Sequence, residues 1–82
     1  MKNERLLALG RQIRQLREQK GLSQEAFAAE AGLDRGYYGG VERGERNIAA
    51  LNLIKIAITL KIEVGQLFPE LAALRRLGGN SK

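Results

Sequence analysis

The sequence predicts an all-α fold, and three observations support this prediction. Apolar residues recur at helical spacing along almost the whole chain, and no stretch shows the sustained alternation typical of a half-buried strand. The chain has 82 residues, 44% of them hydrophobic, which suffices for one core and leaves little room for a second. Repeats and low-complexity linkers are absent from the sequence. We therefore expect one domain over residues 1–77 and a flexible tail over residues 78–82.

Capping residues predict where the first three helices begin and end. Residues 4–19 carry an apolar stripe at helical spacing, preceded by Asn3 and followed by Gly21. Ser23 is the expected N-cap of a second helix that ends near Glu30, because Gly32 interrupts it. Asp34 is the expected cap of a third segment, which runs to about residue 43 and is stopped by glycine 44.

Three more helical segments are expected after a polar loop at residues 45–47. The first covers about residues 50–60, and a short one around residues 64–68 has Glu63 as its expected cap. Pro69 is expected at the first position of a last short helix, residues 70–77, because proline is favoured there.

Composition narrows the classes of function. The chain contains neither Cys nor His, which excludes a disulfide scaffold and zinc ligation through sulfur or imidazole. It also lacks the nucleophiles and bases that small enzymes use most often, so we expect no enzyme, no cofactor and no metal. The formal net charge of +5 favours nucleic acid as the partner, with an acidic membrane surface as the weaker alternative. No signal peptide or membrane span is visible, and we expect a cytoplasmic protein without a membrane partner.

The second and third segments have the residue spacing of a helix-turn-helix, over about residues 23–43. Counted from Gln24, the fifth residue is Ala28, which must be small because the next helix crosses over it. The ninth is Gly32, which suits a turn with positive φ. The fifteenth and eighteenth, Tyr38 and Val41, are apolar and are expected in the core.

On these residues the chain resembles the XRE-type (Cro and phage-repressor-like) helix-turn-helix family. The matching text is IRQLREQKGLSQEAFAAEAGLDRGYYGGVERGERNI, followed by LIKIAITL and GQLF, within residues 9–68. The resemblance implies a five-helix, lambda-repressor-like DNA-binding domain, here with a short extra C-terminal helix. It also implies a sequence-specific transcriptional regulator that binds double-stranded DNA with its third helix in the major groove. Within the family, the chain looks most like the controller proteins of restriction–modification systems, which bind palindromic operators as homodimers. An antitoxin-like protein, whose main partner is a toxin, is the alternative.

The resemblance also assigns roles to individual residues. Those that it places at base edges are Arg35, Gly36 and Gly40. Tyr37 is expected to point outward at the groove and to touch a thymine methyl, stack on a sugar or bond a phosphate, and its plain alternative is an exposed aromatic side chain without a role. Those expected at phosphates are Ser23, Gln24, Arg43, Arg46 and Asn47. Arg17 and Glu42 are expected to form a partly buried ion pair between the first and third helices. For the arginines the plain alternative is a solvated surface charge, and Arg46 has the further alternative of entering the groove.

An extra apolar stripe predicts a dimer interface. Leu51 and Ile58 stand seven residues apart, where the family usually has polar residues, so they share one face of the fourth helix. We expect a homodimer through residues on this face and toward the C-terminus, namely Leu51, Ile58, Ile62, Leu67, Phe68, Leu71 and Leu74. The alternative is that the C-terminal helix folds back and covers the stripe.

The third helix is rich in glycine. Gly36, Gly39 and Gly40 reduce helix propensity, yet they also remove side-chain bulk from a helix expected to lie in a groove. Gly36 departs from the polar residue that the family usually has at this position. We therefore expect fewer direct base contacts and a larger share of recognition through phosphates and DNA shape.

Overall fold

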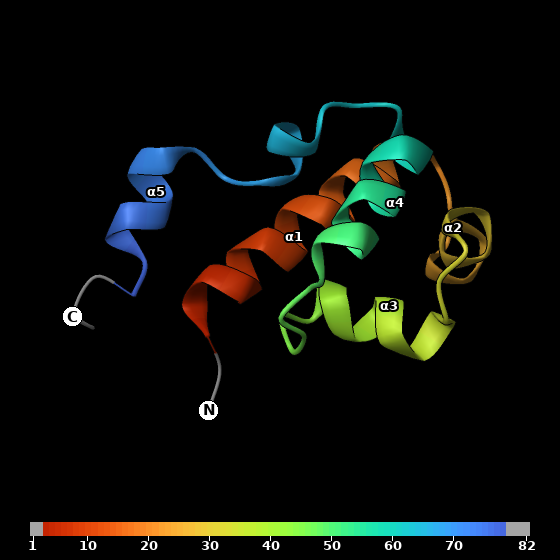
Figure 1. Cartoon of the computed structure of the whole chain (residues 1–82), viewed down its shortest axis with the longest axis horizontal. Helices are drawn as coiled ribbons and strands as arrows, with labels where there is room; N and C mark the ends of the chain where they lie inside the picture. Colours follow the sequence, from red (N-terminus) through yellow and green to blue (C-terminus); the bar gives the residue numbers. More distant parts are fainter. Residues whose placement is uncertain (1–2, 79–82) are drawn as a thin grey trace.

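Five α-helices and one 3₁₀ helix follow one another along residues 3–78 (Figure 1). The computed structural model describes residues 3–78, and no strand occurs within this range. The predicted flexible tail therefore lies outside the described residues, except for Gly78. The elements are α1 (Glu4–Gln19), α2 (Gln24–Ala31), α3 (Arg35–Glu42), α4 (Ala50–Leu60), η1 (Val64–Leu67) and α5 (Leu71–Arg76). The all-α fold class is confirmed.

The predicted caps of the first three helices are present. Asn3 Oδ1 accepts hydrogen bonds from two backbone amides in the first turn of α1, at 2.9 and 3.1 Å. Ser23 Oγ accepts from the amide of Ala26 at 3.0 Å, and Asp34 Oδ2 accepts from the amide of Tyr37 at 3.0 Å. Each bond satisfies an amide that has no partner inside the helix.

Two of the predicted segments differ from those observed. The segment at residues 64–67 is a 3₁₀ helix, in which Glu63 N donates to Gln66 Oε1 at 2.9 Å. The last helix starts at residue 71 with Glu70 as N-cap, so Pro69 precedes the helix instead of opening it. Helix α4 covers the predicted residues 50–60, and its C-cap Lys61 adopts φ 62° although it carries a Cβ. No glycine marks this end in the sequence.

The core lies where α1, α2, α3, α4 and η1 meet. Its largest fully buried side chains are those of Ile13, Phe27, Tyr38, Val41, Ile56 and Leu67. Phe27 and Tyr38 are in contact, with ring centroids 5.1 Å apart. Leu67 was predicted to lie in a dimer interface, but it is 0% exposed in the single chain and belongs to this core. The 3₁₀ turn points it inward, between α1 and α4.

Two glycines let the turn after α3 and α3 itself approach α1 closely. A Cβ on Gly10 would lie 2.4 Å from the carbonyl oxygen of Val41 and 2.6 Å from that of Glu42. A Cβ on Gly44, at φ +76°, would lie 2.7 Å from Cα of Leu7. Distances this short exclude a side chain at either position without movement of the backbone.

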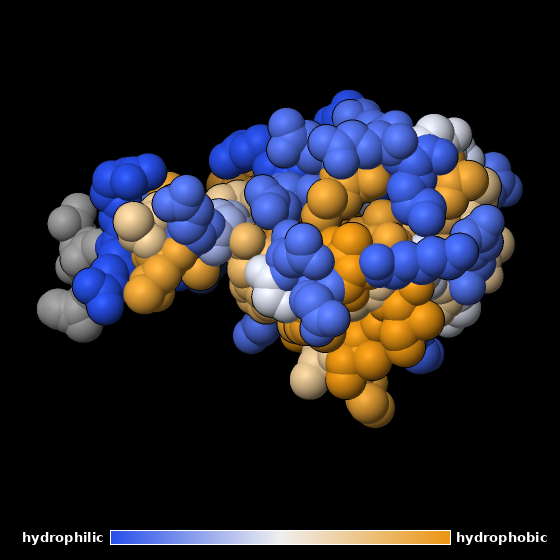
Figure 2. All heavy atoms as spheres, turned by 90° about the horizontal axis from the view of Figure 1, so that it is seen from above, coloured by the Kyte–Doolittle hydropathy of each residue, from blue (hydrophilic) through white to orange (hydrophobic). Residues whose placement is uncertain are grey.

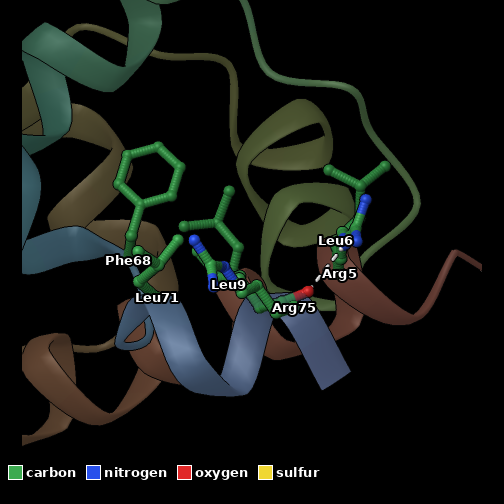
Figure 3. Close-up of a pocket in the computed structure, with 7 residues that line it drawn as sticks. Arg5, Leu6, Leu9, Phe68, Leu71 and Arg75 are labelled. Atoms are coloured by element: carbon green, nitrogen blue, oxygen red, sulfur yellow. Dashed lines mark hydrogen bonds between the residues drawn. The ribbon is translucent and has the colours of Figure 1, made fainter. Parts of the chain in front are cut away.

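Helix α5 lies to one side of the other helices (Figure 1). None of its residues is buried, and a groove of about 380 Å³ separates it from α1. Figure 3 shows Leu6, Leu9, Phe68 and Leu71 along this groove. Arg5 joins the two helices, because its Nε donates to the carbonyl oxygen of Leu74 at 2.9 Å. Helix α5 therefore borders the start of α1 and does not cover the exposed side of α4.

Candidate nucleic-acid interface

The pair α2–α3 is held in the arrangement that its spacing predicts. Ala28 is 1% exposed and Tyr38 is fully buried, so the small and the large position both lie in the core. Gly32 caps α2 at φ 72°, in the left-handed region that favours glycine. Asp34 then starts α3 after only one further residue, which keeps the turn between the two helices short.

A buried ion pair anchors α3 to α1. Arg17 Nε lies 2.7 Å from Glu42 Oε2, and Arg17 Nη2 lies 3.0 Å from Glu42 Oε1, which is a bidentate pair. The side chains of Arg17 and Glu42 are 9% and 2% exposed. Arg17 Nη1 also donates to the carbonyl oxygen of Leu22 at 2.7 Å, which ties the turn before α2 to the same pair.

Two further donors reach the same carboxylate. Gln24 Nε2 donates to Glu42 Oε1 at 2.9 Å, and the Tyr38 hydroxyl donates to Glu42 Oε2. Glu42 thus gathers hydrogen bonds from α1, α2 and its own helix. Within residues 3–78, every buried side-chain nitrogen or oxygen has a hydrogen-bond partner.

These contacts shift the pKa values of the three groups. Burial on its own raises the pKa of the Glu42 carboxyl, but hydrogen bonds from Arg17, Tyr38 and Gln24 outweigh it and leave the pKa below its ordinary value. The hydrogen bond to Glu42 raises the pKa of Arg17. Burial, then the bond to Glu42, raises the pKa of the Tyr38 hydroxyl. At neutral pH the cluster is therefore an ionised carboxylate, a guanidinium and a neutral phenol.

The start of α2 presents the first predicted phosphate ligands. Ser23 is exposed, and its Oγ accepts the capping bond while its O–H remains a donor. Gln24 is half-buried and bonded to Glu42. An amide nitrogen carries two N–H donors, so this bond is compatible with a second one to a phosphate.

The two adjacent glycines of α3 make room for two arginines from the following turn. A Cβ on Gly39 would lie 3.1 Å from Arg43 Nη1, and a Cβ on Gly40 would lie 3.2 Å from both Cγ and Nε of Arg46. Gly40 was predicted to face base edges, but it is buried. The Arg46 side chain lies over it, so arginine atoms take the place of the missing side chain on this part of α3.

Tyr37 is half-buried and does not point freely outward as predicted. Its hydroxyl oxygen accepts a hydrogen bond from Asn52 Nδ2 on α4 at 3.1 Å. The guanidinium carbon of Arg46 lies 5.6 Å from the centre of its ring. Sequence reasoning missed Asn52, since an amide in the first turn of a helix gives no signal of a partner fifteen residues away.

The remaining predicted contact residues lie on the surface. Arg35, Gly36 and Asn47 are exposed. Arg43 is exposed too, and its Nε lies 3.1 Å from Glu45 Oε2. Arg35 is the first residue of α3, Arg43 is its C-cap and Arg46 follows in the next turn, and all three are exposed. Counterions around such charges are readily exchanged for phosphates.

Helix α4 has an exposed apolar face. Leu51 and Ile58 are 73% and 69% exposed, and Ile54, between them on the same face, is 42% exposed. Ile54 was not predicted as an interface residue, although its spacing of three and four residues from the others places it there. Figure 2 shows an apolar area on the body of the molecule, bordered by hydrophilic side chains. Of the other predicted interface residues, Leu71 is exposed, whereas Ile62, Phe68 and Leu74 are half-buried.

Two negative findings apply to the described part of the chain. Among residues 3–78, no three Asp or Glu side chains are grouped so that they could hold a metal ion. None of the helices there is both long and apolar enough to cross a membrane.

The fold and the site define the class of protein. The helix-turn-helix family model HTH_3 matches residues 13–67, and the chain belongs to this family. It is a DNA-binding transcriptional regulator of the XRE type and not an enzyme.

Relatives place it more closely within the class. The control protein C.MunI of Mycoplasma sp is 41% identical over 70 residues, which cover 84% of this chain and 95% of that protein. The crystal structure of the restriction–modification controller protein C.AhdI from Aeromonas hydrophila is similar, with a TM-score of 0.75 and 52% identity. The match covers 77% of this chain and 96% of C.AhdI. The biofilm regulator SinR, solved in complex with DNA, matches with a TM-score of 0.69 and 32% identity over 72% of this chain and 95% of SinR.

Proposed function

We propose that this regulator is the controller of a restriction–modification system and that it binds a palindromic operator as a homodimer in the cytoplasm. The identities to C.MunI and C.AhdI support the controller role, because both relatives are control proteins and this chain matches nearly their full length. The observation that carries the DNA-binding site is the set of exposed arginines in and just after α3, a helix that the Arg17–Glu42 pair fixes to the core.

DNA is captured by charge and then read by α3. Arg43 and the start of α2 approach phosphates, where the helix N-terminus favours an anion. Arg46, which lies over Gly40 on α3, takes the alternative role of entering the groove. Arg35, in the first turn of α3, extends into the major groove. Its guanidinium has the geometry to bond O6 and N7 of one guanine, which discriminates against other bases by about 1–3 kcal/mol.

The apolar face of α4 supports the homodimer. Leu51, Ile54 and Ile58 form one stripe, which costs free energy when it is exposed to water. A second copy offers the same stripe, and a two-fold axis through it pairs each residue with its equivalent. A dimer of this kind presents two copies of α3 to two half-sites of a pseudo-palindrome.

The DNA proposal is tested by selecting duplexes from a random-sequence pool with the wild-type protein. We expect enrichment of one palindromic sequence. Arg35→Ala should flatten the preference for that sequence more than it weakens binding to unrelated DNA. Arg11→Ala, an exposed charge on α1, is the control and should leave the preference unchanged. An unaltered preference in Arg35→Ala would contradict the base contact.

The dimer is tested by sedimentation. We expect Leu51→Glu and Ile58→Glu to give monomers, since each buries a carboxylate in the proposed interface. Leu71→Glu places the same charge on α5 and tests whether that helix contributes to the dimer interface. Survival of the dimer in all three variants would place the interface elsewhere.

The alternative, an antitoxin-like protein, would use the apolar groove between α1 and α5 for its partner. A native pull-down distinguishes the controller from the antitoxin-like protein, because a tightly bound toxin protein would contradict the controller proposal. A neighbouring endonuclease–methyltransferase gene pair would support the controller.

A further inference from the structure

Asn52 lies in the first turn of α4, but its side chain does not serve that helix. The N-cap of α4 is Ala49, and no side chain caps this end. Instead Asn52 Nδ2 donates to the Tyr37 hydroxyl oxygen over 3.1 Å, and both side chains are half-buried. The amide therefore connects the helix that carries the apolar face to the helix that faces DNA.

Tyr37 in turn supports Arg46. The guanidinium carbon lies 5.6 Å from the ring centre, within the range of a cation–π contact. Farther back, Cγ and Nε of the same arginine pass over Gly40, where any Cβ would be only 3.2 Å away. Arg46 is thus bounded by an aromatic ring along one part of its length and by bare backbone along another.

We propose that Asn52 is a positioning residue for operator discrimination, because it holds the Tyr37 ring and thereby the Arg46 guanidinium in place on α3 before DNA binds. This inference rests on the proposed function, which makes α3 the helix that reads the operator. An arginine side chain loses conformational entropy when it is fixed in a complex. If Tyr37 already holds Arg46 in the free protein, less of this entropy is lost when DNA binds. Phosphate contacts tolerate many orientations and should not need it.

The test compares Asn52→Ala, Tyr37→Phe and the double variant on the selected operator and on unrelated DNA. We expect Asn52→Ala to lower the ratio of specific to non-specific affinity about two- to tenfold, the range of one net hydrogen bond. Non-specific affinity and its salt dependence should not change. On the Tyr37→Phe background, Asn52→Ala should have no further effect, since the bond is already absent.

Two controls separate positioning from general destabilisation. Thr59→Val alters a half-buried polar side chain at the other end of α4 and should leave the ratio unchanged. Binding is measured at concentrations where every variant sediments as the wild type does. In NMR spectra of the free protein, the Arg46 side-chain protons should lose their ring-current shift in Asn52→Ala.

Several results would overturn the inference. An unchanged affinity ratio in Asn52→Ala, an equal loss of specific and non-specific binding, or a full effect on the Tyr37→Phe background would each do so. If the wild type enriches no sequence at all, the proposed function fails and this inference fails with it. If the wild type enriches a sequence but Asn52→Ala discriminates equally well, only the role of Asn52 is wrong.

Discussion

At the residue scale, Glu42 is the point where the polar contacts of the core converge. It accepts hydrogen bonds from Arg17, Gln24 and Tyr38, which come from three different helices. A buried ion pair adds little to stability, since well-packed apolar residues in its place would serve as well. Loss of one partner is costly, because it leaves an uncompensated charge in the core. Glu42 therefore links α3 to α1 and α2 through hydrogen bonds, beside the apolar contacts of Tyr38 and Val41.

Glu42→Gln should lower the free energy of unfolding by about 3–5 kcal/mol at neutral pH, because Arg17 is left buried without its counter-charge. The measurement is urea denaturation. Glu45→Gln is the matched control, since Glu45 pairs with Arg43 on the surface and both side chains are at least half exposed. That change should cost at most about 1 kcal/mol.

The same carboxyl predicts a pH dependence. Because its folded-state pKa lies below the ordinary value of 4.5, its stabilisation is present above pH 4.5 and is lost as the pH falls below it. In denaturation curves from about pH 7 to about pH 3, the difference in unfolding free energy between wild type and Glu42→Gln should shrink with acidity. A difference that stays constant over this range would contradict the assigned ionisation.

Gly10 carries the close contact between α1 and α3. Gly10→Ala should lower the free energy of unfolding by about 1–3 kcal/mol, although alanine favours a helix, because its Cβ would collide with two backbone carbonyls. Gly65→Ala is the control, since nothing lies within 4 Å of the added Cβ. Equal thermal stability of the two variants would show that α1 and α3 can move apart at this contact without loss of stability.

At the scale of elements, most helix ends follow from side-chain caps and glycines, but the end of α4 does not. Lys61 takes a left-handed conformation that usually costs a residue with a Cβ about 1–2 kcal/mol. The helix ends there because the chain must turn toward η1, where Leu67 enters the core. Packing of η1 therefore outweighs the local strain at Lys61.

Lys61→Gly should be more stable than Lys61→Ala by about 1 kcal/mol, since both remove the charge and only glycine relieves the strain. Thermal unfolding measures the difference, which should appear as a shift in Tm of roughly 4–8 °C for a domain of this size. An alanine variant as stable as the glycine variant would mean that the end of α4 relaxes on substitution.

At the scale of the whole molecule, charge and apolar surface lie on different elements. The net charge is +5, and Arg35, Arg43 and Arg46 are exposed in and just after α3, whereas the exposed Leu51, Ile54 and Ile58 share one face of α4. This separation is compatible with the proposed homodimer, in which α4 would pair with a second copy while α3 faces DNA. It also predicts binding that depends strongly on salt.

The logarithm of the affinity for DNA should fall linearly with the logarithm of salt concentration, by about 0.9 per phosphate neutralised. Arg43→Ala should make this slope shallower by about one unit per subunit. Arg11→Ala removes the same charge from α1 and should leave the slope nearly unchanged. Identical slopes for the two variants would mean that Arg43 acts only as a diffuse charge.

The sequence by itself determined the helices, their first three caps and the helix-turn-helix spacing, because these depend on hydrogen bonds and periodicity within a few residues. It also indicated Tyr38 and Val41 as core residues, since apolar spacing defines the inner face of α3. Only the tertiary structure decided that Arg46 covers Gly40, that Asn52 holds Tyr37 and that Leu67 is buried. These contacts join residues from different elements, and the path of the chain between elements, which local pattern does not specify, brings them together.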